Sequence, residues 1–206
     1  AVLGRRSVYM SDRETISVYD EQAARYADLT DEANTEDPQL TRFIQAVPTG
    51  GKVLDLGCGP GASSVIMAQA GLEVEAMDAS AEMVRLASAH PGVSARQAAF
   101  SDLTAEGVYD GIWANFSLLH AKRADFPKHL SAIHRALKPK GVFYIAMKLG
   151  QGEGPDRLGR FYSYYSEEDL KTYLQKAGFT VTARRLGSGT GLDGSVSDWI
   201  GLAAHA

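Results

Sequence analysis

Three glycines stand together between a short apolar segment and a helix-forming segment. Gly57, Gly59 and Gly61 directly follow residues 52–56, and a helical pattern begins at Ala62. Glycine lets the chain turn tightly and lets a ligand approach the backbone, and the first turn of a helix offers N–H groups without partners. The sequence therefore predicts a loop that binds a cofactor through its backbone.

An acidic residue follows this loop at a spacing typical of nucleoside recognition. Asp78 directly follows the next apolar segment, Leu72–Met77, and lies 21 residues after Gly57 (78 − 57). A carboxylate at this spacing accepts hydrogen bonds from both hydroxyls of a ribose. The alternative is that Asp78 caps the helix that Ser80 opens.

The acid–base candidate is a histidine in the segment Phe116–His120. Its imidazole is neutral near pH 7 and can accept a proton from an incoming nucleophile. Hydrogen bonding within the loop is the ordinary alternative for His120. Cys58 lies inside the glycine loop, but the sequence identifies no base beside it, so we interpret it as a small packing residue.

The segment 148–165 contains three basic residues followed by four aromatic residues. Arg157 and Arg160 can bind a carboxylate or a phosphate, and Tyr162 can contact a planar molecule. These residues predict a binding surface for a planar or anionic small molecule. The alternative is a solvated loop whose tyrosines pack on the sheet. The segment Gly150–Pro155 is rich in glycine and is expected to be a mobile loop.

Alternating apolar and helical patterns must position these residues. Helical spacing predicts a helix at Thr15–Leu29, a second one opening at Pro38, and four more after the glycine loop. Seven strands are expected, at Lys52–Leu56, Leu72–Met77, Val93–Gln97, Tyr109–Ala114, Gly141–Lys148, Phe179–Leu186 and Val196–Ala203. The last two should be antiparallel, because residues 187–194 leave no room for a crossover helix. This order predicts an α/β fold with a doubly wound, seven-stranded mixed sheet and helices on both faces.

Composition and charge exclude several classes of protein. The chain has 206 residues, 45% of them hydrophobic, which fits one globular domain spanning residues 1–206, with residues 1–14 flexible. The longest apolar run, Val142–Met147, is too short to cross a membrane, and residues 1–10 lack the apolar region of a secretory signal. The net charge of −4 and the scattered basic residues disfavour a nucleic-acid partner. One cysteine permits no internal disulfide and no cysteine-based zinc site, and it indicates a cytoplasmic location.

The glycine loop also fits a second class of enzyme. Gly57, Gly59 and Ala62 match the loose dinucleotide pattern G-x-G-x-x-G/A. Tyr144 and Lys148 have the i, i+4 spacing of the catalytic pair of short-chain dehydrogenases. That pair falls in an expected strand, where residues four apart are separated by about 13 Å. A nicotinamide-dependent oxidoreductase therefore stands as the second hypothesis.

Several segments between Lys52 and Lys148, roughly half of the chain, have the residue types of known motifs. They are Val53–Gly61, Asp78–Met83, Ser101–Leu103, Tyr109–Asn115 and Leu137–Gly141. The first resembles motif I of the class I S-adenosylmethionine-dependent methyltransferases. In the order given, the others resemble the segment after the second strand of that family, its adenine-contacting segment, its motif IV and the turn before its fifth strand. The resemblance implies a Rossmann-like fold and S-adenosylmethionine as the cofactor.

The resemblance also implies a role for each matched residue. The cofactor site would comprise residues for the methionine part (Asp55, Gly57, Cys58, Gly59, Gly61), the ribose (Asp78, Ala79), the adenine (Met83, Asp102, Leu103) and the methyl group (Ala114, Asn115). Helices at residues 15–48 would cover the site and close Tyr19 and Tyr26 over the cofactor. Met83 also fits a core position, and Asp102 also fits a loop cap.

The implied reaction is direct transfer of a methyl group to a small-molecule acceptor, with no metal ion. The Asn-Pro-Pro-aromatic motif of amide and adenine nitrogen methylation is absent, because Asn115 is followed by Phe-Ser-Leu. The accepting atom, O, N, S or C, stays open, as does the choice between monomer and homodimer. A third hypothesis is a protein that binds the cofactor without turnover.

Overall fold

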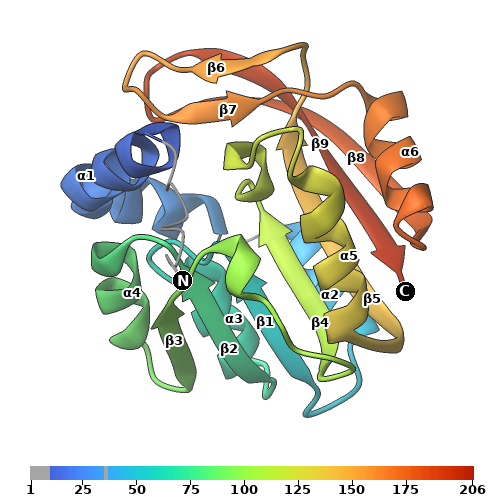
Figure 1. The fold of residues 1–206 in the computed structure, drawn as a ribbon. Helices are drawn as coiled ribbons and strands as arrows, with labels where there is room; N and C mark the ends of the chain where they lie inside the picture. The colour runs from blue at the N-terminus through green and yellow to red at the C-terminus, as the bar shows by residue number, and fades with distance from the viewer. Residues whose placement is uncertain (1–9, 35–36) are drawn as a thin grey trace, which may run out of the picture.

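A seven-stranded mixed sheet runs through the molecule (Figure 1). The computed structural model describes residues 10–34 and 37–206, and the structural findings below concern these residues. The strands lie in the order β3-β2-β1-β4-β5-β9-β8. Their bounds are β1 Lys52–Leu56, β2 Glu73–Asp78, β3 Val93–Gln97, β4 Tyr109–Asn115, β5 Leu137–Lys148, β8 Thr180–Thr190 and β9 Val196–His205.

The first five strands are parallel, and the last two add antiparallel pairing. Val53 of β1 lies opposite Val74 of β2 and Gly111 of β4. β9 runs antiparallel between β5 and β8, with Val142 opposite His205. Because β1 has a strand on each side and helices on both faces, its apolar run is buried. This arrangement confirms the predicted doubly wound mixed sheet.

Helices cover both faces of the sheet. On one face, α5 and α6 pack through Phe126 and Leu170 into the core cluster that contains Phe143 of β5. On the other face, Phe43 of α2 packs against Trp113 of β4. The helices span α1 Met10–Asn34, α2 Pro38–Ala46, α3 Ala62–Gln69, α4 Ala81–Ser88, α5 Phe126–Ala136 and α6 Glu167–Lys176, with short 3-10 turns η1 Phe100–Asp102 and η2 Leu118–His120.

Side-chain caps fix the start of two helices where the sequence predicts them. Ser80 accepts the N–H of Met83 at the start of α4 (3.2 Å), and Ser166 accepts the N–H of Asp169 at the start of α6 (3.1 Å). Each cap satisfies one of the N–H groups that a helix leaves unpaired at its first turn. The cap at Ser80 places the first turn of α4 directly after the end of β2.

Helix α1 is longer than its apolar spacing predicts. It extends from Met10 to Asn34, so residues 10–14 are helical, while residues 1–9 lie outside the described part of the chain. The apolar pattern gives no signal before Thr15, because the preceding residues are mostly polar. Helix α1 lies beside the carboxyl edge of the sheet (Figure 1). Helix α2 packs on a face of the sheet through Phe43 and Trp113, and the prediction that the N-terminal helices cover the cofactor site stays a prediction.

A two-stranded hairpin replaces the mobile loop predicted at Gly150–Pro155. Strand β6, Glu153–Pro155, pairs antiparallel with β7, Phe161–Ser163. Between them, Asp156 Oδ1 accepts the N–H groups of Leu158 (3.0 Å) and Arg160 (2.9 Å). This carboxylate-centred turn holds the glycine-rich segment in one conformation, and the hairpin crosses above the carboxyl edge of the sheet (Figure 1).

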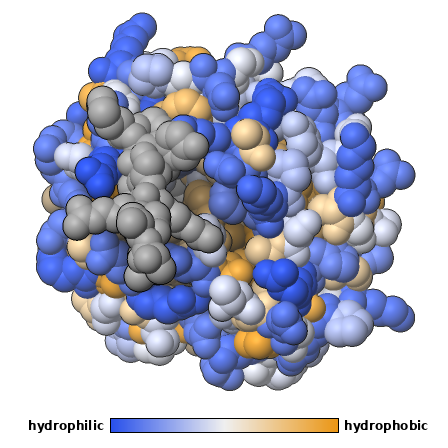
Figure 2. All heavy atoms as spheres, viewed as in Figure 1, coloured by the Kyte–Doolittle hydropathy of each residue, from blue (hydrophilic) through white to orange (hydrophobic). Residues whose placement is uncertain are grey.

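Hydrophilic side chains dominate the face of the molecule drawn in Figure 2, and apolar side chains appear on it as small separate areas. The large apolar side chains that are most exposed are Leu186, on the edge strand β8, and Val196, at the start of β9. Among the helices of residues 10–34 and 37–206, none combines the length and the apolar character needed to span a membrane.

Candidate active site

The parallel strands end at one edge of the sheet, and the predicted cofactor residues gather there. Strand β1 leads into the glycine loop, β2 ends at Asp78, and β4 ends at Asn115. Gly57 and Cys58 donate their N–H groups to the carbonyl of Met77, at 2.8 and 3.0 Å. The structure therefore brings the glycine loop against the end of β2, where the predicted ribose carboxylate lies.

Two glycines of the loop have positive φ values, and at one of them a side chain would overlap a neighbour. Gly57 has a φ of +74°, and a Cβ there would come within 2.2 Å of the Ser117 Cβ. Gly59 has a φ of +54°, and its Cβ would lie 3.4 Å from the ring of Tyr26 on α1. Residues with side chains rarely adopt such φ values. The loop therefore presents bare backbone at Gly59 toward α1 and at Gly57 toward Ser117, as close approach of an elongated cofactor requires.

Asp78 accepts two hydrogen bonds from the main chain. Its Oδ2 accepts from the N–H of Gly59 and its Oδ1 from the N–H of Ser80, each at 2.9 Å. The second bond is the capping contact given above as the alternative, and the first turns the carboxylate toward the glycine loop. Burial raises the pKa of Asp78, and the two N–H donors oppose that rise. Each oxygen keeps a lone pair that can accept from a ribose hydroxyl.

A second carboxylate lies under the loop. Asp55 of β1 is buried and accepts a hydrogen bond of 2.6 Å from the hydroxyl of Ser64. Burial raises the pKa of Asp55 to about 7, although the Ser64 hydroxyl opposes the rise. Burial also raises the pKa of the Cys58 thiol, whose Sγ donates to the Gly59 carbonyl at 3.3 Å. Cys58 is thus a protonated packing group at neutral pH.

The residues predicted on the adenine side lie on α4 and at η1. Met83 is buried on α4. Asp102 Oδ2 accepts the N–H of Ala99 at 2.8 Å, which is the loop cap given above as the alternative. The other predicted cofactor contacts lie in the core or at strand ends, and they are Ala79, Leu103, Ala114 and Asn115.

One side of α1 faces this edge of the sheet. Asp20 accepts a hydrogen bond of 2.5 Å from the Ser80 hydroxyl, next to Asp78. The hydroxyl of Thr15 accepts the N–H of Phe161 in β7 at 2.8 Å. Tyr19 lies one turn after Thr15 on the same side, since residues four apart share a helix face. Helix α1 thus connects α4 with the hairpin.

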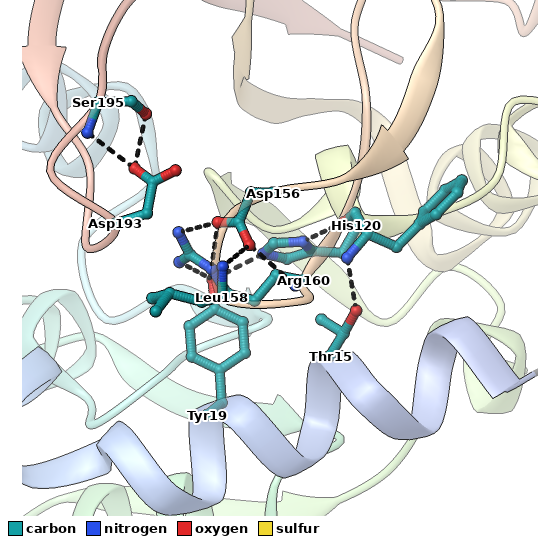
Figure 3. A network of polar contacts seen from close by, with 9 residues as sticks. Thr15, Tyr19, His120, Asp156, Leu158, Arg160, Asp193 and Ser195 are labelled. Atoms are coloured by element: carbon teal, nitrogen blue, oxygen red, sulfur yellow. Dashed lines mark hydrogen bonds and ion pairs between the residues drawn. The ribbon is translucent and has the colours of Figure 1, made fainter.

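His120 is bound at both ring nitrogens (Figure 3). Its Nδ1 lies 2.7 Å from the carbonyl oxygen of Phe161, which can only accept, so Nδ1 carries the proton. Burial lowers the pKa of His120 to about 4, so the ring is neutral at pH 7. Its Nε2 then has a free lone pair and accepts from the Tyr19 hydroxyl at 2.7 Å. His120 is therefore a neutral hydrogen-bond acceptor fixed behind the Tyr19 phenol.

The structure corrects the prediction that Arg160 is available to a substrate. Arg160 is 2% exposed, and its Nε and Nη2 donate to Asp156 Oδ2 at 2.9 and 2.7 Å. Its Nη1 donates to the Tyr19 hydroxyl at 3.1 Å (Figure 3). Arg157 is exposed in the turn of the hairpin, and Tyr162 is buried. Arg160 thus orients Tyr19, and its charge is already matched by a carboxylate.

Sequence reasoning missed Thr15, Asp20, Ser117 and Asp156. Three of them form contacts with segments far away in the chain; for example, the Ser117 hydroxyl donates to the Leu56 carbonyl at 2.6 Å. No local pattern announces such contacts. Asp156 did have a local signal, because aspartate followed three residues later by glycine is typical of a type I turn.

The tyrosine–lysine pair of the oxidoreductase hypothesis does not form. Tyr144 is buried and its ring stacks on Trp113, with ring centroids 4.1 Å apart. The Nζ of Lys148 lies elsewhere, 4.4 Å from the centre of the Tyr162 ring. The two side chains have different neighbours, as their spacing along a strand predicts.

Known proteins resemble this chain in sequence. A family model described as a methyltransferase domain matches residues 19–184. The chain is 31% identical over 170 residues to the uncharacterized methyltransferase sll0829 of Synechocystis, with 75% of this chain and 78% of that protein covered. It is 34% identical over 136 residues to the cypemycin N-terminal methyltransferase of a Streptomyces species, with 63% of this chain covered. That second match spans only 56% of the relative's length.

Solved structures share the fold. The 1,6-didemethyltoxoflavin-N1-methyltransferase of Burkholderia thailandensis, solved with 1,6-didemethyltoxoflavin and S-adenosylhomocysteine, has a TM-score of 0.74 at 21% identity. That match covers 100% of this chain and 92% of the other. A methyltransferase of Methanosarcina mazei has a TM-score of 0.70 at 18% identity, with 82% and 97% covered. The family match overturns the oxidoreductase hypothesis. The chain belongs to the class I S-adenosylmethionine-dependent methyltransferases.

Proposed function

We propose that this methyltransferase acts on a small-molecule acceptor by direct displacement, without a metal ion. The bound cofactor supplies an activated methyl group on its sulfur. The glycine loop with Asp55 would hold the amino-acid part, Asp78 the ribose, and Met83 with Asp102 the adenine. Support comes from the bare backbone of the loop and from the lone pairs that Asp78 keeps beside its two main-chain bonds.

The hydrogen bond between Tyr19 and His120 is the observation that carries this proposal. An acceptor next to Tyr19 would pass its proton to the phenol oxygen while Tyr19 passes its own proton to His120 Nε2. The Phe161 carbonyl holds the tautomer that leaves Nε2 open, and burial keeps the ring neutral. The guanidinium of Arg160 stabilises negative charge on the phenol oxygen during this exchange.

The surroundings of this pair favour an acceptor of limited size. Helix α1, the β6–β7 hairpin and the loop between β8 and β9 lie around it (Figure 3). Direct transfer depends on alignment and exclusion of water. Groups of three or more His, Cys, Asp or Glu side chains that could hold a metal ion are absent from the described ranges. The Burkholderia relative, solved with 1,6-didemethyltoxoflavin, matches over the whole chain and favours a planar small molecule over a peptide.

The cofactor assignment is tested by calorimetric titration with S-adenosylhomocysteine. We expect Asp78→Ala to weaken binding at least tenfold, because two hydroxyl bonds to a buried carboxylate are lost, and tenfold corresponds to about 1.4 kcal/mol. Asp110→Ala is the matched control, since Asp110 lies at the opposite end of β4 and binds Lys138. Equal affinity of the wild type and Asp78→Ala would contradict the ribose assignment.

The proton-transfer assignment is tested by methyl transfer across a panel of phenols, carboxylic acids, thiols and amines. We expect Tyr19→Phe and His120→Gln to lower kcat by about 10²–10⁴-fold, with the affinity for S-adenosylhomocysteine within threefold of wild type. Tyr173→Phe, on α6, is the matched control. Wild-type kcat in both variants would refute the assignment, and cofactor binding without turnover of any acceptor would favour a binding protein.

A further inference from the structure

The acceptor side of the site contains two cationic side chains, and they differ in how their charge is matched. Arg160 forms a buried ion pair with Asp156, at 2.7 Å. Lys148 ends β5 at the same edge of the sheet and is half-buried. Among the side chains that the structure describes, those of residues 13–28 and 37–206, no carboxylate oxygen lies within 4.0 Å of its Nζ. Lys148 is therefore a cation without a contacting anion.

An aromatic ring lies against Lys148 and connects it to the proton acceptor. The Nζ is 4.4 Å from the centre of the Tyr162 ring, and that ring is 4.6 Å from the centre of the His120 imidazole. These two distances place the ammonium within about 9 Å of His120. A cation–π contact compensates only part of the hydration that a lysine loses. The ammonium therefore retains capacity for an anion beside the reacting groups.

A glycine, Gly191, lies next to the ammonium. A Cβ at Gly191 would lie 3.4 Å from Lys148 Nζ and 3.3 Å from Asp193 Oδ1. That carboxylate oxygen is bound within its own loop, because it accepts from the N–H and the hydroxyl of Ser195 at 2.9 and 2.6 Å (Figure 3). Burial and the charge of Arg160 lower the pKa of Lys148, while Asp193 opposes them.

We propose that Lys148 binds an oxyanion of the methyl acceptor, either a carboxylate or a phosphate, and so places the accepting atom beside the Tyr19–His120 pair. This assignment rests on the proposed function and specifies the substrate class of the same site. Arg160, neutralised by Asp156, positions Tyr19 instead of binding the acceptor. A neutral acceptor of the same shape would leave the ammonium unmatched, so the site discriminates against it.

The test measures binding of simple anions to the protein saturated with S-adenosylhomocysteine. The probes are benzoate for a carboxylate, phenyl phosphate for a phosphate, and benzamide as the neutral shape control. We expect the wild type to bind at least one of the two anions and to bind it at least tenfold more tightly than benzamide. Lys148→Met should lower that affinity at least tenfold, and Lys148→Arg should stay within about threefold of wild type. Lys171→Met, an exposed lysine paired with Glu167 on α6, is the matched control and should bind as wild type does.

The outcomes separate this inference from the function on which it rests. Binding of S-adenosylhomocysteine by the wild type and by Lys148→Met, measured first, shows that the cofactor site and the fold are intact. The inference is overturned if neither anion binds the wild type, or if an anion binds the wild type and Lys148→Met equally. Failure of the wild type to bind S-adenosylhomocysteine contradicts the proposed function itself. The arm that binds, benzoate or phenyl phosphate, identifies the anion.

Discussion

At the scale of single residues, His120 is both hydrogen-bonded at its two ring nitrogens and held neutral by burial. Its imidazole is fixed by hydrogen bonds at both nitrogens, and burial keeps it neutral well below the ordinary pKa of histidine. A buried neutral imidazole can accept a proton only while a nearby group stabilises the charge that forms. In the proposed transfer the Phe161 carbonyl, which accepts the Nδ1–H, and the negative charge of Asp156 would stabilise the charged ring, because both raise the pKa of His120.

The burial of His120 predicts that this residue makes the free energy of unfolding depend on pH. Between pH 6.5 and about 4 the unfolded chain binds a proton at His120 that the folded chain does not bind. The contribution of His120 to the free energy of unfolding is therefore fully present above pH 6.5 and is lost as the pH falls toward 4. We expect His120→Gln to flatten this dependence, measured by urea denaturation at pH 7.0, 5.5 and 4.5. A constant difference between variant and wild type at all three pH values would contradict the neutral, buried state.

The pKa of Asp55, raised to about 7, acts in the opposite direction. The folded chain binds a proton at Asp55 that the unfolded chain does not bind between about pH 7 and 4, so this group favours the folded state as the pH falls. The stability of the wild type alone thus mixes two trends. The difference between His120→Gln and wild type isolates the histidine, because Asp55 is the same in both proteins.

At the scale of elements, the loop after β1 and the segment after β4 are in close contact. The glycine loop after β1 meets the segment after β4, where Phe116 has a φ of +53° and the Ser117 hydroxyl donates to the Leu56 carbonyl. Such a φ is uncommon for a residue with a side chain and persists only where neighbours enforce it. This contact therefore fixes the distance between the cofactor loop and the segment that leads to His120.

This contact predicts different effects for two glycine substitutions. Gly57 and Gly107 both have positive φ, but a Cβ at Gly57 would overlap Ser117 whereas one at Gly107 meets no atom within 4 Å. Both alanine variants carry the backbone strain, so their difference measures the overlap alone. We expect Gly57→Ala to be less stable than Gly107→Ala by about 2 kcal/mol and to lose affinity for S-adenosylhomocysteine. Equal midpoints in urea would show that the two loops can separate freely.

The hairpin depends on its buried ion pair. Removing one partner of such a pair leaves an unmatched charge and costs about 3–5 kcal/mol. We expect Arg160→Met to lower the free energy of unfolding by that amount, whereas Arg157→Met, three residues earlier and exposed, should change it by less than about 0.5 kcal/mol. Thermal and urea denaturation of the two variants measure both values. Similar stability of the two arginine variants would contradict the buried pairing.

The elements that the sequence predicted well are those with local signals. Apolar runs mark the central strands, and the glycines with Ser80 mark where strands give way to helices. The hairpin and the full length of α1 were missed for the same physical reason. Their order comes from contacts such as Thr15 with Phe161, which are 146 residues apart in the chain. Such contacts leave no trace in the spacing of apolar residues.

At the scale of the molecule, the two halves of the site differ in how far they could be predicted. The cofactor half lies on consecutive strand ends, so motif spacing predicts which residues gather there, and the structure places Asp55, Asp78 and the glycine loop together. The acceptor half is built from α1, η2 and the hairpin. The sequence predicts that Arg160 is available to bind an anion, whereas in the fold its charge is matched by Asp156.

The packing of Trp199 has a practical consequence. A Cβ at Gly187 would come within 2.2 Å of its indole, so that ring lies across the strand pair β8–β9, and its centroid is 5.7 Å from that of Phe116. The second tryptophan, Trp113, is fully buried against Tyr144. Trp199 of β9 lies opposite Lys148 of β5, so we expect its fluorescence to change when an acceptor binds at Lys148, and Trp199→Phe to abolish that change. The protein thus contains an intrinsic optical reporter, with which candidate acceptors can be ranked by titration before any methylated product is known.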